Sequence, residues 1–142
     1  MSSCTLCGID RHVVARNDHW ALCLNDDQAF LGRCFVALNR HETDVTSLSQ
    51  AERDSLWDLL AQGKGALDKL FKPDHYNYAF LMNLTPHVHM HIIPRYAAPR
   101  TFGGVDVTDT AFNAHYDPAA ALLLPEPVQA DLAAAIKGAL AR

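Results

Sequence analysis

The sequence lacks the features of membrane-spanning, secreted and nucleic-acid-binding proteins. No apolar run approaches the roughly 20 residues that a membrane-spanning helix needs. The first ten residues lack the basic start and apolar stretch of a signal peptide, so we expect a cytoplasmic protein that does not bind a membrane. The 12 Lys and Arg residues are outnumbered by 16 Asp and Glu, for a net charge of −4. A pI near 6.0 argues against a nucleic-acid partner, which usually requires a basic surface.

The chain also has no internal repeat, no low-complexity linker and few cysteines. Its 142 residues, 49% of them hydrophobic, are enough for one domain over residues 1–142, with a core that needs no disulfides. Of the four cysteines, Cys23 and Cys34 lie in apolar runs and are predicted core residues. In a reducing compartment, Cys4 and Cys7 are better explained as thiols or metal ligands than as a disulfide.

Hydrophobic patterning predicts an α+β fold. Strands are expected at Trp20–Leu24, at Cys34–Leu38, at residues 75–83 and at residues 87–94, with a short edge strand at 13–15. The last two main strands are expected to pair antiparallel across a tight link at 84–86. A short helical turn is expected at 27–30.

Two helices complete the prediction. Ser49 followed three residues later by Glu52 forms a capping box, and apolar residues then recur at helical spacing, which predicts a central helix at about 49–71. Apolar residues at every fourth position predict a second helix at about 127–141. Residues 95–126 are rich in Pro, Gly and Asp and are predicted to form a long loop.

The most informative segment is the run His-Val-His-Met-His at residues 87–91. In a strand this spacing places all three histidines on one face, while Val88, Met90 and Ile92 face the core. Imidazole transfers protons, binds metal or attacks an electrophile near neutral pH. The residues alone leave two chemical alternatives, a metal site that needs further ligands and a nucleophilic histidine with supporting neighbours.

The run from His87 to Ile93 resembles the motif of the histidine triad (HIT) superfamily, in which three histidines alternate with apolar residues. The segment Asn39-Arg40-His41 before the capped helix is similar to another family segment, which usually reads Pro-Lys-x-His. The likeness covers residues 4–96 and leaves 97–142 as a C-terminal extension with a helix. It implies a five-stranded antiparallel sheet, a homodimer, and hydrolysis or transfer of nucleotides at the α-phosphate.

The resemblance also implies site residues. His89 would attack the α-phosphorus, and His91 and His87 would contact phosphoryl or leaving-group oxygens. Leu24 and Asn25 lie where the family binds the ribose, although the family residue there is usually Asp. The glycine-rich loop before the triad is missing, and Asn83 and Thr85 are candidate replacements.

Cys4 and Cys7 have the two-residue spacing of a tetrahedral thiolate pair. A redox pair and two unliganded thiols are the alternatives. Some HIT proteins that this chain resembles carry such a pair at the same place and bind structural zinc. The resemblance implies the ligands Cys4, Cys7, His41 and His87, in which case His87 cannot also donate freely to substrate.

The favoured function is hydrolysis of dinucleoside polyphosphates, such as diadenosine tetraphosphate, or of nucleoside phosphoramidates. Alternatives are a nucleotidyl transferase or phosphorylase, a poorly catalytic nucleotide-binding module, and a metalloenzyme that recruits other histidines, namely His12, His19, His75 or His115. Four residues of the C-terminal part are interpreted as ordinary surface residues, although they could reach the site: Tyr96, Arg100, His115 and Tyr116.

Overall fold

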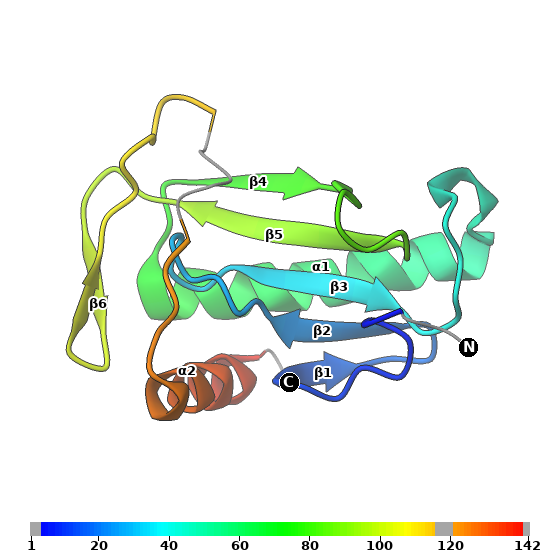
Figure 1. The fold of residues 1–142 in the computed structure, drawn as a ribbon, viewed down its shortest axis with the longest axis horizontal. Helices are drawn as coiled ribbons and strands as arrows, with labels where there is room; N and C mark the ends of the chain where they lie inside the picture. The colour runs from blue at the N-terminus through cyan, green and yellow to red at the C-terminus, as the bar shows by residue number, and fades with distance from the viewer. Residues whose placement is uncertain (1–3, 116–120, 141–142) are drawn as a thin grey trace.

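The computed structural model describes residues 4–115 and 121–140. Five strands form one antiparallel sheet in the order β1-β2-β3-β5-β4 (Figure 1). They are β1 (Val13–Arg16), β2 (Trp20–Leu24), β3 (Cys34–Leu38), β4 (His75–Ala79) and β5 (His89–Arg95). The predicted α+β class and five-stranded sheet are therefore confirmed.

Helix α1 (Gln50–Phe71) runs behind the sheet and covers one of its faces (Figure 1). Its capping box is complete, because the Glu52 amide donates to Ser49 Oγ at 3.1 Å and the Ser49 amide donates to Glu52 Oε1 at 2.8 Å. The helix approaches the sheet closely at Gly63, where a Cβ would lie 3.2 Å from a methyl of Leu22. These features confirm the central helix and explain how it packs.

The C-terminal helix α2 (Glu126–Ala139) packs against α1 and β1. It buries Leu132 and Ile136 completely, as the fourfold spacing predicts. Within the described ranges, no helix is long and apolar enough to cross a membrane. A short 3₁₀ helix, η1 (Val45–Ser47), precedes α1.

The two strands around the histidine motif are shorter than predicted. Strand β4 ends at Ala79 rather than residue 83, and β5 begins at His89 rather than residue 87. The connection is therefore the irregular segment 80–88, not a three-residue link. Within this segment, Met82 adopts a left-handed backbone with φ of 53°, a conformation outside the strand region. His87 thus lies before the strand, so the alternation of a strand does not govern its direction.

The predicted helical turn at 27–30 is wrong, and a side-chain-braced loop takes its place. Gln28 is fully buried, and its amide donates to the carbonyls of Asn25 at 2.8 Å and Arg33 at 3.0 Å. Its Oε1 accepts from the Gly32 amide at 2.7 Å. Gly32 has φ of +91°, and a Cβ there would lie 2.7 Å from Leu67. This brace fixes the loop that leads into β3.

Residues 95–126 contain structure that the predicted loop missed. Strands β6 (Arg100–Phe102) and β7 (Val105–Val107) form a hairpin across Gly103-Gly104, both at positive φ. A Gly-Gly pair is a common two-residue hairpin turn, so the signal was present in the sequence.

Two residues interpreted as surface residues have structural roles. Tyr96 is buried and its hydroxyl donates to the carbonyl of Leu31 at 2.5 Å. Arg100 Nε donates at 2.7 Å to the carbonyl of Phe71, the last residue of α1. His115 is exposed, as expected, and Tyr116 lies outside the described residues.

Candidate functional site

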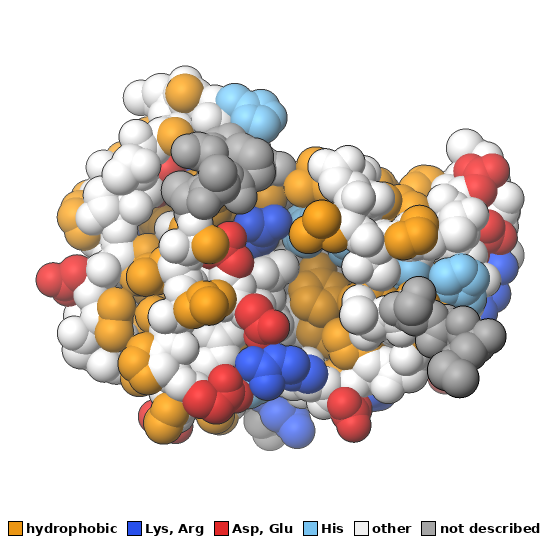
Figure 2. All heavy atoms as spheres, viewed as in Figure 1, with side chains coloured by type: hydrophobic (Ala, Val, Ile, Leu, Met, Phe, Trp, Pro, Cys, Tyr) orange, Lys and Arg blue, Asp and Glu red, His pale blue; other side chains and the backbone are white. Residues whose placement is uncertain are grey.

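A cavity of about 650 Å³ opens on the face of the sheet opposite α1. Figure 2 shows this face hollowed near its centre, with apolar side chains in the floor and charged side chains along the rim. Six residues singled out in the sequence line the cavity together: Leu24, Asn25, Asn83, Thr85, His89 and His91. The remaining wall is supplied by residues that the motif did not indicate, namely Leu6, Ile9, Arg11, Asp26, Asp27, Arg33, Phe35, Leu81, Met82 and Leu84.

His89 is held in one tautomer by the backbone. Its Nδ1 lies 2.6 Å from the carbonyl oxygen of His87, so Nδ1 carries the proton and donates it. The neutral ring then has its lone pair on Nε2. Burial lowers the pKa of His89, which favours the neutral form. This combination produces a nucleophilic nitrogen at neutral pH.

His91 is held by a side chain rather than by the backbone. A guanidinium N–H of Arg33 donates to Nδ1 of His91 at 3.3 Å. Burial, and after it the charge of Arg33, lowers the pKa of His91 to about 3. The rings of His89 and His91 stand edge to face with centroids 4.9 Å apart, and Phe35 lies across from them on β3. His91 is therefore neutral, and Nε2 is the nitrogen at which it can donate.

The polar wall beside the histidines belongs to the loop after β2. Asn25 Oδ1 accepts from the Asp27 amide at 2.9 Å, which fixes the side chain in a local turn. Asp27 Oδ1 accepts from the amides of Ala29 and Leu122, each at 3.0 Å. These contacts hold two polar side chains of the cavity wall in fixed positions.

His87 has different surroundings from the other two histidines. It is completely buried and is not one of the residues that line the cavity. Its Nε2 lies 2.6 Å from the carbonyl oxygen of Leu38, which assigns the proton to Nε2. Its Nδ1 is thereby an acceptor, and it lies 3.3 Å from Cys4 Sγ and 3.5 Å from Cys7 Sγ.

His41 completes this second group. Its Nδ1 lies 3.3 Å from Cys7 Sγ and 3.2 Å from His87 Nδ1, and all four ligand atoms lie within 4.8 Å of one another. A tetrahedral zinc ion places a sulfur and a nitrogen ligand about 3.6 Å apart and two nitrogen ligands about 3.3 Å apart. The cluster of Cys4, Cys7, His41 and His87 therefore fits a zinc ion in both ligand type and spacing.

The surroundings of Cys4 favour the thiolate form of its side chain. Burial acts to raise its pKa, but hydrogen bonds from Cys7 and from backbone amides outweigh that effect and lower the pKa to about 6. A thiolate is the form that binds zinc.

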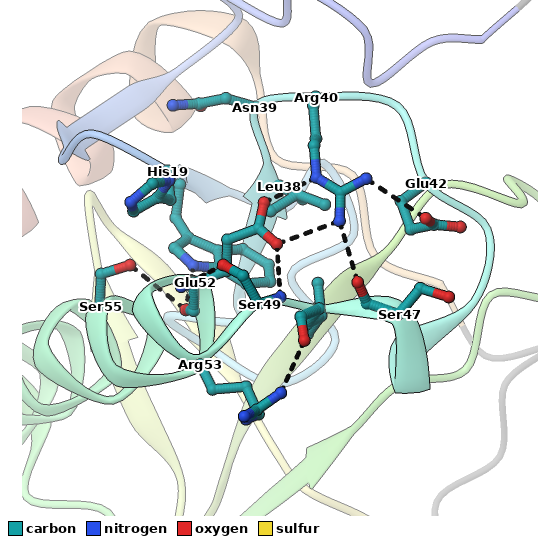
Figure 3. A network of polar contacts seen from close by, with 12 residues as sticks. His19, Leu38, Asn39, Arg40, Glu42, Ser47, Ser49, Glu52, Arg53 and Ser55 are labelled. Carbon is teal, nitrogen blue, oxygen red and sulfur yellow. Dashed lines mark hydrogen bonds and ion pairs between the residues drawn. The ribbon is translucent and has the colours of Figure 1, made fainter.

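A charged network fixes the segment that carries His41 (Figure 3). Arg40 Nε donates to Glu52 Oε2 at 2.7 Å, and its Nη2 donates to Oε1 at 3.0 Å and to the carbonyl of Ser47 at 3.2 Å. The hydrogen bonds from Arg40 lower the pKa of Glu52 to about 2. The capping carboxylate of α1 thus also anchors the residue before His41.

The cluster and the cavity share a wall. Leu6 lies between the two cysteines in sequence and lines the cavity with Ile9. Thr5 Oγ1 lies 3.4 Å from Thr85 Oγ1, which connects the cysteine loop to segment 80–88. Sequence spacing alone does not reveal this contact, because it joins residues 80 positions apart.

Arg33 and Phe35 are cavity residues that the alternation of the sequence could have predicted. Cys34, Val36 and Leu38 are buried in the core, so strand alternation places residues 33 and 35 on the opposite face, with the cavity.

Within 4–115 and 121–140, the one cluster of three or more metal-ligating side chains consists of Cys4, Cys7, His41 and His87. The alternative of a metal on the histidine strand therefore finds no support in the described residues.

Comparisons with known proteins agree with this geometry. A family model described as the HIT domain matches residues 8–98. An uncharacterised HIT-like protein of Mycoplasma genitalium is 28% identical over 112 residues, which is 72% of this chain and 79% of that protein. A Hit-like protein from Bartonella henselae, described as involved in cell-cycle regulation, matches with a TM-score of 0.70 and 17% identity over 94% of this chain and 89% of that one.

A zinc-bound histidine triad family protein from Mycobacterium smegmatis matches with a TM-score of 0.68 and 14% identity. That match covers 96% of this chain and 92% of the other. The structural likenesses show the fold, and the family model spans well over half of the sequence. The chain therefore belongs to the HIT domain family.

Proposed function

We propose that the protein hydrolyses nucleotides at the α-phosphate through a covalent nucleotidyl intermediate on His89. The observation that carries the proposal is the 2.6 Å contact of His89 Nδ1 with the carbonyl of His87, in a ring that lines the cavity. This contact leaves Nε2 as the lone-pair nitrogen. Candidate substrates are dinucleoside polyphosphates and nucleoside phosphoramidates.

The reaction has two steps. Nε2 of His89 attacks the α-phosphorus, a phosphorus–nitrogen bond forms, and the bond to the leaving group breaks with its electron pair. His91 donates a hydrogen bond from Nε2 to a phosphoryl oxygen as charge develops there. Water then attacks the same phosphorus and loses a proton to solvent, the phosphorus–nitrogen bond breaks with its electron pair returning to Nε2, and the nucleoside monophosphate leaves the neutral ring of His89.

The cavity supports a nucleotide substrate. Its volume of about 650 Å³ lies within the range of small-molecule sites. Leu24, Phe35 and Leu81 provide apolar wall for a base, and Asn25 and Asn83 provide polar groups for sugar or phosphate. HIT family proteins are generally nucleotide hydrolases or transferases, which fits this arrangement.

Trapping the intermediate tests the proposal. The protein is mixed with diadenosine tetraphosphate or adenosine 5′-phosphoramidate, quenched within milliseconds to seconds and digested for mass spectrometry. We expect an adenylyl group on the peptide that contains His89, and incorporation of one ¹⁸O from labelled water into AMP. Turnover without an adduct at any quench time would contradict a covalent route. An adduct resolved by an acceptor other than water would identify a transferase.

A nucleotide-binding module with little turnover is the second candidate. The absence of glycine from the connection before the triad favours it, as does Asn25 in place of the family's usual Asp. It predicts nucleotide binding without product from either substrate. The family resemblance also implies a homodimer, which stays a prediction.

We also propose that Cys4, Cys7, His41 and His87 hold a structural zinc ion. With all four ligands from protein, bound zinc would supply no reactive position and would fix the cysteine loop against His87. Protein purified without added metal is expected to contain about one zinc per chain by elemental mass spectrometry. His41→Asn should lose most of it, and His75→Asn, at an equally exposed histidine outside the cluster, should keep it. Equal zinc in both variants would contradict the ligand set.

A further inference from the structure

Arg33 occupies an unusual position between two groups of the cavity. It directly precedes β3, and only 11% of its side chain is exposed. Its Nη2 donates to Nδ1 of His91 at 3.3 Å, and its Nη1 lies 3.7 Å from Asp27 Oδ2. The guanidinium therefore borders the cavity in contact with one of the two histidines of β5.

A guanidinium can only donate hydrogen bonds, and it keeps its charge at all physiological pH values. Nδ1 of His91 must therefore accept, and the proton of the neutral ring must lie on Nε2. Without such a donor, a neutral imidazole divides between its two tautomers, and one of them presents no N–H at Nε2. The tautomer of His91 thus depends on the side chain of Arg33, the residue just before the neighbouring strand β3.

We propose that Arg33 is a positioning residue that fixes the proton of His91 on Nε2 and so supplies the hydrogen-bond donor for the phosphoryl group that His89 attacks. This rests on the function proposed above. Arg33 acts through His91. Its effect on the tautomer can be measured separately from its effect on catalysis, because the tautomer exists without substrate.

The backbone around Arg33 is built to hold it there. Its amide donates to the carbonyl of Phe30 at 2.9 Å, and its carbonyl accepts from the Asn25 amide at 3.0 Å and from buried Gln28. Gly32 provides the left-handed turn immediately before it. Asp27, itself fixed by two backbone amides, balances the charge of the guanidinium on the other side. A side chain anchored in this way can impose a tautomer on its neighbour.

The cavity offers a matched control in Arg11. Arg11 also lines the cavity, but its guanidinium binds Asp26 at 2.9 Å and Glu126 at 3.1 Å rather than a histidine. Removing either arginine deletes one positive charge from the same cavity. Only the loss of Arg33 removes the donor to His91, so the pair separates a positioning effect from general electrostatics.

The test uses the full chain labelled with ¹⁵N-histidine, in which nitrogen chemical shifts report the tautomer of each ring. We expect His91 to be more than nine-tenths in the Nε2–H form. In Arg33→Met the Nδ1–H fraction should rise at least threefold, and the pKa of His91 should rise, because the positive charge of Arg33 no longer opposes protonation of the buried ring. Arg33→Lys, which keeps a charged donor, should recover most of the Nε2–H form. Arg11→Met should leave the tautomer unchanged.

Kinetics supply the second readout. Arg33→Met should lower kcat for diadenosine tetraphosphate at least tenfold with KM within threefold, whereas Arg11→Met should act mainly on KM. An unchanged His91 tautomer in Arg33→Met would overturn the proposal, whatever the activity of that variant. A shifted tautomer with unchanged kcat would overturn it as well. Absence of turnover in the unmodified protein, with the tautomer still dependent on Arg33, would instead count against the proposed hydrolysis.

Discussion

Replacement of His89 with glycine is expected to lower kcat for nucleotide hydrolysis by on the order of 10⁴-fold or more, because it removes the atom that forms the covalent bond. The ring is held by a hydrogen bond to the carbonyl of His87, just before β5, and the loss of the ring leaves a space at the cavity wall. Nucleotide affinity, measured by calorimetry, should stay within about threefold, since the apolar and polar walls remain. Initial rates with diadenosine tetraphosphate measure the effect.

Chemical rescue separates a nucleophile from a structural histidine. Free imidazole should enter the vacated space and restore part of the turnover of His89→Gly in a concentration-dependent way. His75→Gly, at an exposed histidine on β4, is the matched control and should keep full activity without imidazole. Turnover of His89→Gly within tenfold of the unmodified protein would refute the assignment of the nucleophile.

The second large effect concerns stability and lies outside the cavity. Asp109→Ala is expected to lower the free energy of unfolding by about 3–5 kcal/mol, because it leaves the charge of Arg95 buried without its partner. The pair is bidentate, with Arg95 Nε to Asp109 Oδ2 at 2.7 Å and Nη2 to Oδ1 at 3.1 Å. The side chains are 4% and 0% exposed. Urea unfolding followed by circular dichroism measures the change.

A nearby carboxylate provides the comparison. Asp106 lies on β7, is exposed and accepts a hydrogen bond from Thr101 across its hairpin, so Asp106→Ala should cost no more than about 1 kcal/mol. Asp109 also accepts hydrogen bonds from the amides of Tyr96 and Ala111, which increases the destabilisation expected for Asp109→Ala. Replacing both partners, as Arg95→Met with Asp109→Leu, should cost less than Asp109→Ala alone. Equal stability of the Asp106 and Asp109 variants would contradict the buried pair.

Local patterns predicted the elements whose formation depends on near neighbours. The capping box at Ser49 placed the start of α1, and β2 and β3 have the predicted bounds. Val88, Met90 and Ile92 are buried, as alternation around the histidines required. Apart from His87, which is buried outside the cavity, the residues expected around the substrate meet in one cavity, and their roles in binding stay predictions.

The remaining features depend on contacts between distant parts of the chain. The length of β4 is limited by segment 80–88, which leaves the sheet to form a cavity wall. The pairing of Arg95 with Asp109 has no local pattern, and the fixed turn around Gln28 is made by side-chain bonds to three backbone groups. The positions of arginines and acidic residues in a sequence do not show which of them form ion pairs.

The shared wall at Leu6 affects where this protein can be cut or extended. The family match begins at residue 8 and ends at residue 98, but Cys4 and Leu6 precede it, and Leu122, which donates to Asp27, follows it. A chain trimmed to the matched range would lose Leu6 from the cavity wall and would lose the Leu122 amide that holds Asp27, a residue of that wall. A tag fused to Met1 would lie three residues from Cys4, whose Sγ is 3.3 Å from Nδ1 of His87. The cavity wall and the metal-ligating cluster therefore extend beyond the start of the family match.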